Sequence, residues 1–294
     1  MVTMSMFKRL LLVLVTITLT TFSMTAVAQA DQRLAPPDIP GANSMAHANQ
    51  LQSIATANGG NRAHGTSGYR ASADFIQSTL SRAGFTVTRQ QFTYNGALGW
   101  NVIAEWPVGN PNDVVFLGAH LDGVRAGAGI NDNGSGSSAV LETALAVARD
   151  NAQPTKRLRF GWWGAEENGL IGSAYYTRNL PSSERAKIDA YLNFDMVGQR
   201  DTTRWGIYVD SPTLGATFKQ YFDSKGIATR SIDISGRSDH ASFARYGIPV
   251  SGISSGSDPC YHSRCDTIAN IGERVMGHST NAAAYAAWRL AGIP

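Results

Sequence analysis

Acidic and imidazole side chains gather directly after several apolar segments of this chain. They are His120 and Asp122 after residues 114–119, Glu166 and Glu167 after residues 158–163, and Asp195 after residues 191–194. An acid that ends an apolar strand, such as Asp195, is costly to bury unless it is paired or metal-bound. Imidazole nitrogens and carboxylate oxygens together suit zinc, and the chemistry that zinc supports with such ligands is hydrolysis.

Two turns supply the remaining candidates. Asp132 lies in Gly129-Ile-Asn-Asp-Asn-Gly just before a predicted helix, and His262 lies between Cys260 and Cys265. Taken alone, an acid in such a turn is explained as a turn residue or a helix cap. Two zinc ions about 3.5 to 4 Å apart, however, need a carboxylate that bridges them. The combined set therefore points to a centre with two metal ions.

These candidates meet only if a sheet aligns the ends of their strands. Hydrophobic periodicity predicts strands at 85–88, 101–106, 114–119, 157–163, 190–194 and 248–253. It predicts helices at 44–58 (beginning at a Ser44 cap), 137–149, 169–178, 213–225 and 271–290, and one that carries Ala71, Phe75, Ile76 and Leu80 and stops at Gly84. Continuous apolar strands between amphipathic helices favour a single three-layer α/β/α domain with a mostly parallel mixed sheet. Ligands of such sheets bind beyond the carboxyl ends of the strands.

The overall composition is that of a globular protein. Of the 294 residues, 43% are hydrophobic and 16% are charged, which is too apolar for a disordered chain. The formal charge is only +3 and no run of five Lys or Arg occurs, so the chain offers no basic field for nucleic acid. Without an internal repeat or a break in composition, we expect one catalytic domain over residues 31–294.

Residues 1–30 predict an export signal. Lys8 and Arg9 precede an apolar run, 10–21, that is too short to span a membrane, and Ala28-Gln-Ala30 has the form of a cleavage site. Removing the two basic residues leaves 23 Lys and Arg against 22 Asp and Glu, a charge near +1. We therefore expect a secreted protein that does not contact a membrane after cleavage. A retained membrane anchor is the alternative.

Export changes the interpretation of Cys260 and Cys265, the only two cysteines. An oxidising compartment favours a disulfide between them. Because the loop between them is short, such a bridge shapes a local turn more than it stabilises the whole fold. A cysteine-based zinc site is the alternative, but it would need a second cysteine pair.

Six motifs, taken in chain order, resemble those of secreted bacterial di-zinc aminopeptidases of the streptomycete type, in metallopeptidase clan MH. The motifs are His120-Leu-Asp, Gly129-Ile-Asn-Asp-Asn-Gly-Ser-Gly, Trp162-Trp-Gly-Ala-Glu-Glu, Leu192-Asn-Phe-Asp-Met, Gly236-Arg-Ser-Asp-His and Cys260-Tyr-His-Ser-Arg-Cys. Ala35-Pro-Pro-Asp-Ile-Pro and Asn61-Arg-Ala-His-Gly extend the resemblance toward the start of the chain. The resemblance implies a zinc peptidase fold of the phosphorylase/hydrolase-like type and monomeric activity on peptides with a free N-terminus.

The resemblance also implies the metal ligands. Asp132 would bridge two zinc ions, with His120 and Asp195 completing one site and Glu167 and His262 the other.

Further residues receive roles in the reaction from the same resemblance. Glu166 would be the general base that takes a proton from the metal-bridging water and later delivers it to the leaving amine. Tyr261 would donate to the developing oxyanion, and Asp122 would hold His120 in place. Arg237 would help to position the substrate, whereas His240 is expected to be structural.

The residue types favour an aminopeptidase on physical grounds as well. A centre ringed by acids such as Glu166 and Asp195 attracts a free amino group beside the scissile bond. A carboxypeptidase would need a cation for the terminal carboxylate, and only Arg237 lies in a motif.

Two departures from the family pattern stand out. Only Ser254 to Pro259 separates the strand near Ile253 from the cysteine turn, where relatives often carry a longer loop that walls the substrate pocket. We therefore expect the usual preference for large apolar N-terminal residues such as leucine to be broadened. Calcium is not expected, because the acids that relatives pair with the equivalent of Asp38 are replaced by Gly277 and Asn281.

Other functions remain as alternatives. Gly252-Ile-Ser-Ser-Gly256 fits the pattern of a serine hydrolase that would use Ser254, although Pro259 and the cysteine turn follow instead of a helix. The glycines of residues 134–139 fit a dinucleotide fingerprint, but they do not directly follow a strand. A single-zinc cyclotransferase or a carboxypeptidase of the same clan, or a non-catalytic binding module, would share the fold.

Overall fold

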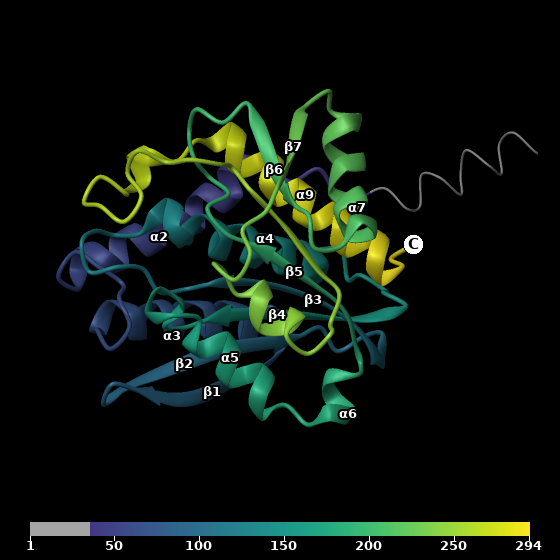
Figure 1. Cartoon of the computed structure of the whole chain (residues 1–294), viewed down its shortest axis with the longest axis horizontal. Coiled ribbons are helices and arrows are strands. Elements are labelled where there is room, and N and C mark those ends of the chain that lie inside the picture. The colour runs from purple at the N-terminus through teal and green to yellow at the C-terminus, as the bar shows by residue number, and fades with distance from the viewer. Residues whose placement is uncertain (1–35) are drawn as a thin grey trace, which may run out of the picture. The chain divides into compact units, whose positions relative to one another are not determined.

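Eight strands form one mixed sheet in the computed structural model, which describes residues 36–294. The strands are β1 (Thr86–Tyr94), β2 (Ala97–Glu105), β3 (Asn110–His120), β4 (Lys156–Trp163), β5 (Ile188–Phe194), β6 (Arg204–Tyr208), β7 (Ala228–Ile232) and β8 (Val250–Ser254). Their order across the sheet is β1-β2-β4-β3-β5-β8-β6-β7. Figure 1 shows β1 and β2 on one side of the sheet and β6 and β7 on the other. Residues 36–293 make up one compact unit. The predicted export signal at residues 1–30 lies outside the described residues.

The four central strands all run in the same direction. β4, β3, β5 and β8 pair in parallel, while β2 and β6 join them on either side in antiparallel pairs. The carboxyl ends of the central strands therefore lie along one edge of the sheet. This edge carries the candidate site.

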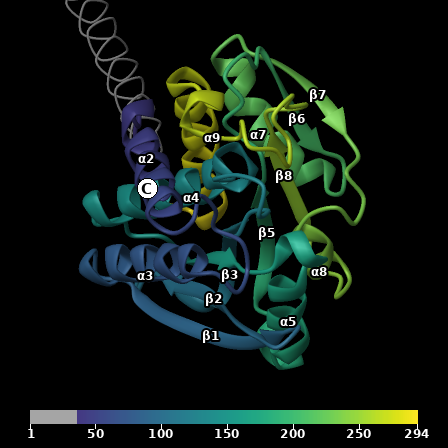
Figure 2. The ribbon, with the colours of Figure 1, turned by 90° about the vertical axis from the view of Figure 1, so that its left-hand side faces the viewer.

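Helices cover both faces of the sheet. Their bounds are α2 (Gly41–Ala57), α3 (Ser67–Arg82), α4 (Gly136–Arg149), α5 (Ile171–Asn179), α6 (Ser182–Arg185), α7 (Pro212–Ser224), α8 (His240–Ala244) and α9 (Glu273–Ala291), with short helical turns η1 (Ile130–Ser135), η2 (Glu166–Asn168) and η3 (Ile268–Asn270). α4 and α9 pack against one face and α5 and α8 against the other, as Figure 2 shows. The three-layer α/β/α architecture predicted from the sequence is confirmed.

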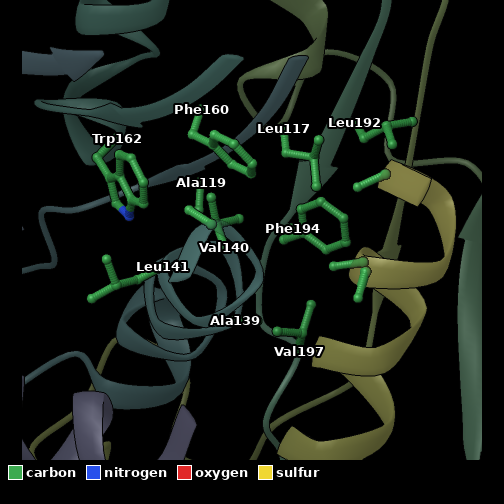
Figure 3. Close-up of a cluster of buried hydrophobic side chains, with 14 of the residues drawn as sticks. Leu117, Ala119, Ala139, Val140, Leu141, Phe160, Trp162, Leu192, Phe194 and Val197 are labelled. Atoms are coloured by element: carbon green, nitrogen blue, oxygen red, sulfur yellow. The ribbon is translucent and has the colours of Figure 1, made fainter. Parts of the chain in front are cut away.

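Alternation along β3 explains why its sequence is continuously apolar. Leu117 and Ala119 face the larger core beneath α4 and α9, whereas Val114 and Phe116 face a second cluster that includes Tyr191. Successive strand residues point to opposite faces, so a strand covered on both sides needs apolar residues throughout. Figure 3 shows Leu117 and Ala119 in the first of these clusters.

The structure corrects the expected start of the first described helix. α2 begins at Gly41, after Pro40, and Ser44 is buried inside it, donating its hydroxyl to the Gly41 carbonyl over 3.0 Å. Proline at the preceding position fixes the backbone and marks the start instead. β6 and β7, which the sequence did not predict, add two short strands at one side of the sheet. Among residues 36–294, no helix is both long and apolar enough to cross a membrane.

Candidate metal centre

The carboxyl edge of the sheet brings the predicted ligands together. His120 is the last residue of β3, Asp195 follows β5, and Glu167 lies in η2 after β4. Asp132 lies in η1, which leads from the β3 loop into α4, and His262 comes from the loop after β8. Five segments that are far apart in the chain thus supply one cluster.

Asp132 stands at the centre of this cluster. Its Oδ1 lies 3.2 Å from His120 Nε2, and its Oδ2 lies 3.1 Å from His262 Nε2. The two oxygens of one carboxylate therefore face two different imidazoles. This is the placement that the bridging role requires.

The other acids divide between the two histidines. Asp195 Oδ1 lies 3.4 Å from His120 Nε2, and Glu166 Oε2 lies 3.9 Å from the same nitrogen. On the other side, Glu167 Oε2 lies 2.9 Å from His262 Nε2. Asp132 thus contacts both histidines, while the two sets of three residues whose donor atoms lie close enough to hold an ion, His120 with Glu166 and Asp195 and His120 with Asp132 and Glu167, share His120.

Asp122 supports the cluster from beneath, in a way that differs in detail from the expectation. The Nδ1 of His120 lies 3.1 Å from the Asp122 backbone carbonyl, whereas it is 3.8 Å from the Asp122 carboxylate. That carboxylate instead accepts the backbone N–H of Glu166 over 3.0 Å and that of Glu167 over 3.4 Å. Asp122 thus orients His120 through its main chain and fixes both glutamates through its side chain.

The electrostatics of the cluster call for positive charge. Burial raises the pKa of Glu166 to about 10 and that of Glu167 to about 8, and neighbouring carboxylates add to both shifts. Asp132 is the exception, because hydrogen bonds to His120 and His262 outweigh its burial and lower its pKa to about 2. Bound cations favour the ionised form of carboxylates beside them. The residues therefore fit a site that binds metal.

Unpartnered atoms support the same conclusion. Oε1 of Glu167 and Oδ1 of Asp195 are buried and accept no hydrogen bond. Buried polar atoms without partners are costly and call for an explanation such as an ion. In each of two sets, the possible ligand atoms lie within 4.8 Å of one another: His120 with Glu166 and Asp195, and His120 with Asp132 and Glu167. The mixed nitrogen and oxygen donor set is one that zinc accepts.

The predicted disulfide between Cys260 and Cys265 is present, with the two Cα atoms 5.2 Å apart. The turn that it closes presents Tyr261 and His262, whose rings stack with centroids 3.8 Å apart. Burial and the charges of Asp132 and Glu167 raise the pKa of Tyr261 to about 12. Its hydroxyl, on a side chain that is largely exposed, therefore stays protonated and able to donate.

Three other sequence candidates lie apart from the ligand groups. Arg237 is exposed, and its guanidinium donates to the carbonyls of Ile234 and Asp233 in its own turn. His240 is buried 3.9 Å from Asp210 and does not belong to either ligand group. Ser254 donates to a backbone carbonyl, and the chain continues from it into a loop rather than a helix, so the structure does not form a nucleophile elbow there.

Sequence reasoning assigned no role to two residues that hold ligands in place. Asp266, which directly follows the disulfide, accepts the backbone N–H groups of Asn131 and Asp132 over 2.6 and 2.9 Å. Ser238 donates to Oδ2 of Asp195 over 2.6 Å. Ser238 lies beside Arg237 in the motif Gly236-Arg-Ser-Asp-His, but the motif does not indicate that Ser238 contacts Asp195. No sequence feature pointed to the role of Asp266.

Gly277 and Asn281, which stand where relatives carry acids, both lie beside the segment that contains Asp38. Asn281 accepts the backbone N–H of Ile39 over 2.9 Å and donates to the Ile39 carbonyl over 2.8 Å. Gly277 has no side chain that could bind calcium, and a Cβ at this position would lie only 3.2 Å from the Cα of Gly41. The amide of Asn281 thus binds the segment beside Asp38 directly.

Fold and site together define a class. An α/β protein with a histidine and carboxylate cluster at the carboxyl edge of a central parallel sheet belongs to the metallohydrolase type. The chain matches the profile of Peptidase family M28 over residues 101–287, and it is a member of that family.

The chain is also similar to named proteins in sequence and to a solved structure in fold. The chain is 53% identical to Leupeptin-inactivating enzyme 1 of Streptomyces exfoliatus, in a match that covers 88% of this chain and 64% of that protein. It is 41% identical to an aminopeptidase of Pseudomonas aeruginosa strain UCBPP-PA14 over 63% of this chain and 40% of that protein. The structure of BSAP, a zinc aminopeptidase from Bacillus subtilis, superposes with a TM-score of 0.79 at 17% identity, covering 88% and 96% of the two chains. The chain therefore spans less than two thirds of the length of these two named relatives.

Proposed function

We propose that this protein is a secreted zinc aminopeptidase that binds two zinc ions and removes N-terminal residues from peptides. Asp132 would bridge the ions. His120 and Asp195 would complete one site, and Glu167 and His262 the other. Zinc in such a centre polarises the scissile carbonyl and lowers the pKa of water, which supplies the nucleophile.

The observation that carries this proposal is the placement of Asp132. One carboxylate has an oxygen 3.2 Å from His120 and the other oxygen 3.1 Å from His262. A single-ion site would need only one of these two groups. The presence of both favours two ions over the single-zinc cyclotransferase alternative.

Glu166 would move protons during the reaction. Its backbone is fixed by Asp122, and its carboxylate is beside the cluster without being between the histidines. It accepts a proton from the attacking water and returns it to the nitrogen of the leaving amine. Burial among other acids raises the pKa of the Glu166 carboxyl, which makes the carboxylate a stronger base for the first of these transfers.

Other residues of the site suit a substrate with a free N-terminus. The carboxylates of Glu166 and Asp195 favour an ammonium group next to the scissile bond. Tyr261, held protonated, donates to the oxygen of that bond as negative charge develops on it. The two named relatives, a leupeptin-inactivating enzyme and an aminopeptidase, support activity on peptides.

Two finer points belong to the same proposal. We propose export by the signal at residues 1–30, which accords with a disulfide in the protein. We also propose a broad preference for the N-terminal side chain, with leucine among the accepted residues, because only five residues, 255–259, connect β8 to the cysteine turn. The mature protein is proposed to act as a monomer.

Metal stoichiometry tests the central claim. The chelated protein is titrated with zinc and assayed on leucyl nitroanilide alongside Asp132→Asn and, as a control, the exposed Asp223→Asn. We expect wild type and the control to bind two zinc ions per chain, and Asp132→Asn to lose at least one ion and the activity. One ion in the wild type together with cyclisation of N-terminal glutamine would instead establish a cyclotransferase.

Rates on a series of aminoacyl nitroanilides test the specificity. We expect kcat/KM for leucine, methionine, phenylalanine and arginine to lie within about tenfold of one another, a span of about 1.4 kcal/mol in transition-state binding. A preference for leucine of a hundredfold or more over every other residue would refute the broad pocket.

A further inference from the structure

Arg62, in the turn between α2 and α3, is the only arginine of the described chain with no exposed surface. Its guanidinium does not pair with a carboxylate. It donates instead to three backbone carbonyls, those of Leu121, Ala128 and Gly129; the Nε to Ala128 distance is 3.0 Å and the Nη2 to Gly129 distance is 2.5 Å. A buried arginine whose three guanidinium nitrogens all donate to main-chain oxygens fixes the position of that main chain.

Three glycines surround this guanidinium at ordinary contact distance. A Cβ on Gly129 or on Gly134 would lie 3.5 Å from Arg62 Nη2, and one on Gly123 would lie 4.0 Å away. Gly129 also has a positive φ of 63°, which favours glycine. A Cβ on Gly129 would also lie 2.7 Å from the Asp132 carbonyl oxygen, so the turn itself requires glycine there.

The segment that Arg62 holds connects two parts of the metal centre. Leu121 lies between His120 and Asp122, and Gly129 lies three residues before Asp132. The three carbonyls are therefore at both ends of the loop 121–129. Movement of this loop would shift His120 at one end and the bridging carboxylate at the other.

Carboxylates near Arg62 stabilise its positive charge against the cost of burial. Burial lowers its pKa to about 10, while Asp122 and Asp266 oppose that shift, so the side chain stays charged at neutral pH. A positive charge near a zinc site weakens the binding of a dication by repulsion. The arginine is kept in this place despite that cost, and the planar fork of its guanidinium reaches three acceptors where an ammonium cannot.

We infer that Arg62 is a positioning residue for the metal centre: by binding the carbonyls of Leu121, Ala128 and Gly129, it sets the separation of His120 and Asp132 and thereby the affinity for zinc. This inference rests on the proposed zinc function and deepens it. Arg62 touches neither substrate nor metal in this role.

If Arg62 acts through its charge, its removal should strengthen zinc binding; if it acts through its hydrogen bonds, its removal should weaken zinc binding. Two substitutions distinguish these cases. Arg62→Met removes the charge and the donors, and Arg62→Lys keeps the charge but loses the fork. The zinc affinity of each variant is measured by competition with a chromophoric chelator, with thermal unfolding in chelator recorded in parallel. Arg159→Met is the control, because Arg159 is a buried arginine of β4 that pairs with Glu105 and Tyr176.

We expect both Arg62 variants to bind zinc about 10- to 100-fold more weakly than wild type, the range found when groups that orient metal ligands are lost. Arg62→Lys should lose at least as much affinity as Arg62→Met, since it keeps the repulsive charge. Arg159→Met should lose stability but keep its zinc affinity within twofold. Tighter zinc binding by Arg62→Met would show that Arg62 acts through its charge and would overturn the inference.

The remaining outcomes are also decisive. Zinc affinity within twofold of wild type in a folded Arg62→Lys would overturn the inference, and this variant keeps the test valid if Arg62→Met does not fold. Equal losses of zinc affinity in Arg62→Lys and Arg159→Met would reduce the effect to general destabilisation and would also overturn it. Failure of the wild type itself to bind zinc would refute the proposed function instead, and the two failures are distinguishable.

Discussion

Two buried glutamates in this protein have opposite surroundings. Glu142 on α4 is 2% exposed and accepts hydrogen bonds from Asn43, His47 and Arg149 over 2.6 to 2.9 Å. Glu166 in η2 is 9% exposed and lies among Asp122, Asp195 and Asp239 rather than among donors. The pKa of Glu142 is lowered because its partners outweigh its burial, and that of Glu166 is raised because burial dominates.

The difference shows how a structural carboxylate differs from a functional one. Glu142 joins α2 to α4, and its charge is fully compensated by the protein. The acids at the carboxyl edge of the sheet are held in place by backbone groups and by Ser238 but are left short of positive charge. These uncompensated acids destabilise the folded protein, but they form a site that binds cations.

The largest expected effect concerns Glu166. Glu166→Gln should lower kcat on leucyl nitroanilide about 10²- to 10⁴-fold, the usual contribution of a general base, while zinc stoichiometry and folding are retained. Glu142→Gln is the matched control and should keep kcat within about twofold. Steady-state kinetics of the two variants measure this difference. Equal losses of kcat in both variants would contradict the distinction between a structural Glu142 and a catalytic Glu166.

Removal of metal should separate the two regions next. Zinc at a thousand times its Kd stabilises a folded protein by about 4 kcal/mol, so thermal unfolding should move to clearly lower temperature in chelator. The loss of stability caused by Glu142→Gln should be the same with and without zinc, because the two regions do not share a partner. A strong dependence of that loss on zinc would show that they are coupled.

Glu142→Gln itself should lower the free energy of unfolding by about 2 kcal/mol at pH 7, since the amide has one acceptor oxygen for three donors. The folded-state pKa of Glu142 lies below its ordinary value of about 4.5. Its contribution is therefore complete above that pH and is lost as the pH falls through the folded-state pKa. Urea unfolding of both proteins should show the difference shrinking below about pH 4.5; a difference that grows there would contradict this assignment.

The smallest expected effect concerns Asp266, a buried acid that resembles Glu142 in its bonding but supports the site. Asp266→Asn keeps one acceptor oxygen and leaves one backbone N–H of Asn131 or Asp132 without a partner. We expect zinc affinity to fall about tenfold, at the lower end for groups that orient ligands. Chelator competition with Asp223→Asn as control measures it, and an unchanged affinity would assign Asp266 to stability alone.

Much of the fold could be predicted because it follows from local patterns. The segments that become β3, β4, β5 and β8 are mainly buried and carry clusters of apolar residues, so the central parallel sheet was correctly predicted. β6 and β7 were missed: both are short, β6 begins with the exposed Arg204, and β7 has no buried residue. β1 and β2 were predicted too short, at 85–88 and 101–106, and the hairpin that joins them was not predicted, although Asn95-Gly96, with φ values of 47° and 75°, is a strong hairpin signal.

The sequence by itself determined the types and chain order of the ligand residues, and the parallel strands that carry them to one edge. Side-chain chemistry and hydrophobic periodicity are local properties, so they can be read from neighbouring residues. Only the tertiary structure decided that Asp132 faces two histidines, that Asp122 uses its main chain toward His120, and that Arg62 and Asp266 hold the intervening loops. Those contacts join residues between 2 and 135 positions apart, and their geometry depends on how the loops pack at the end of the sheet.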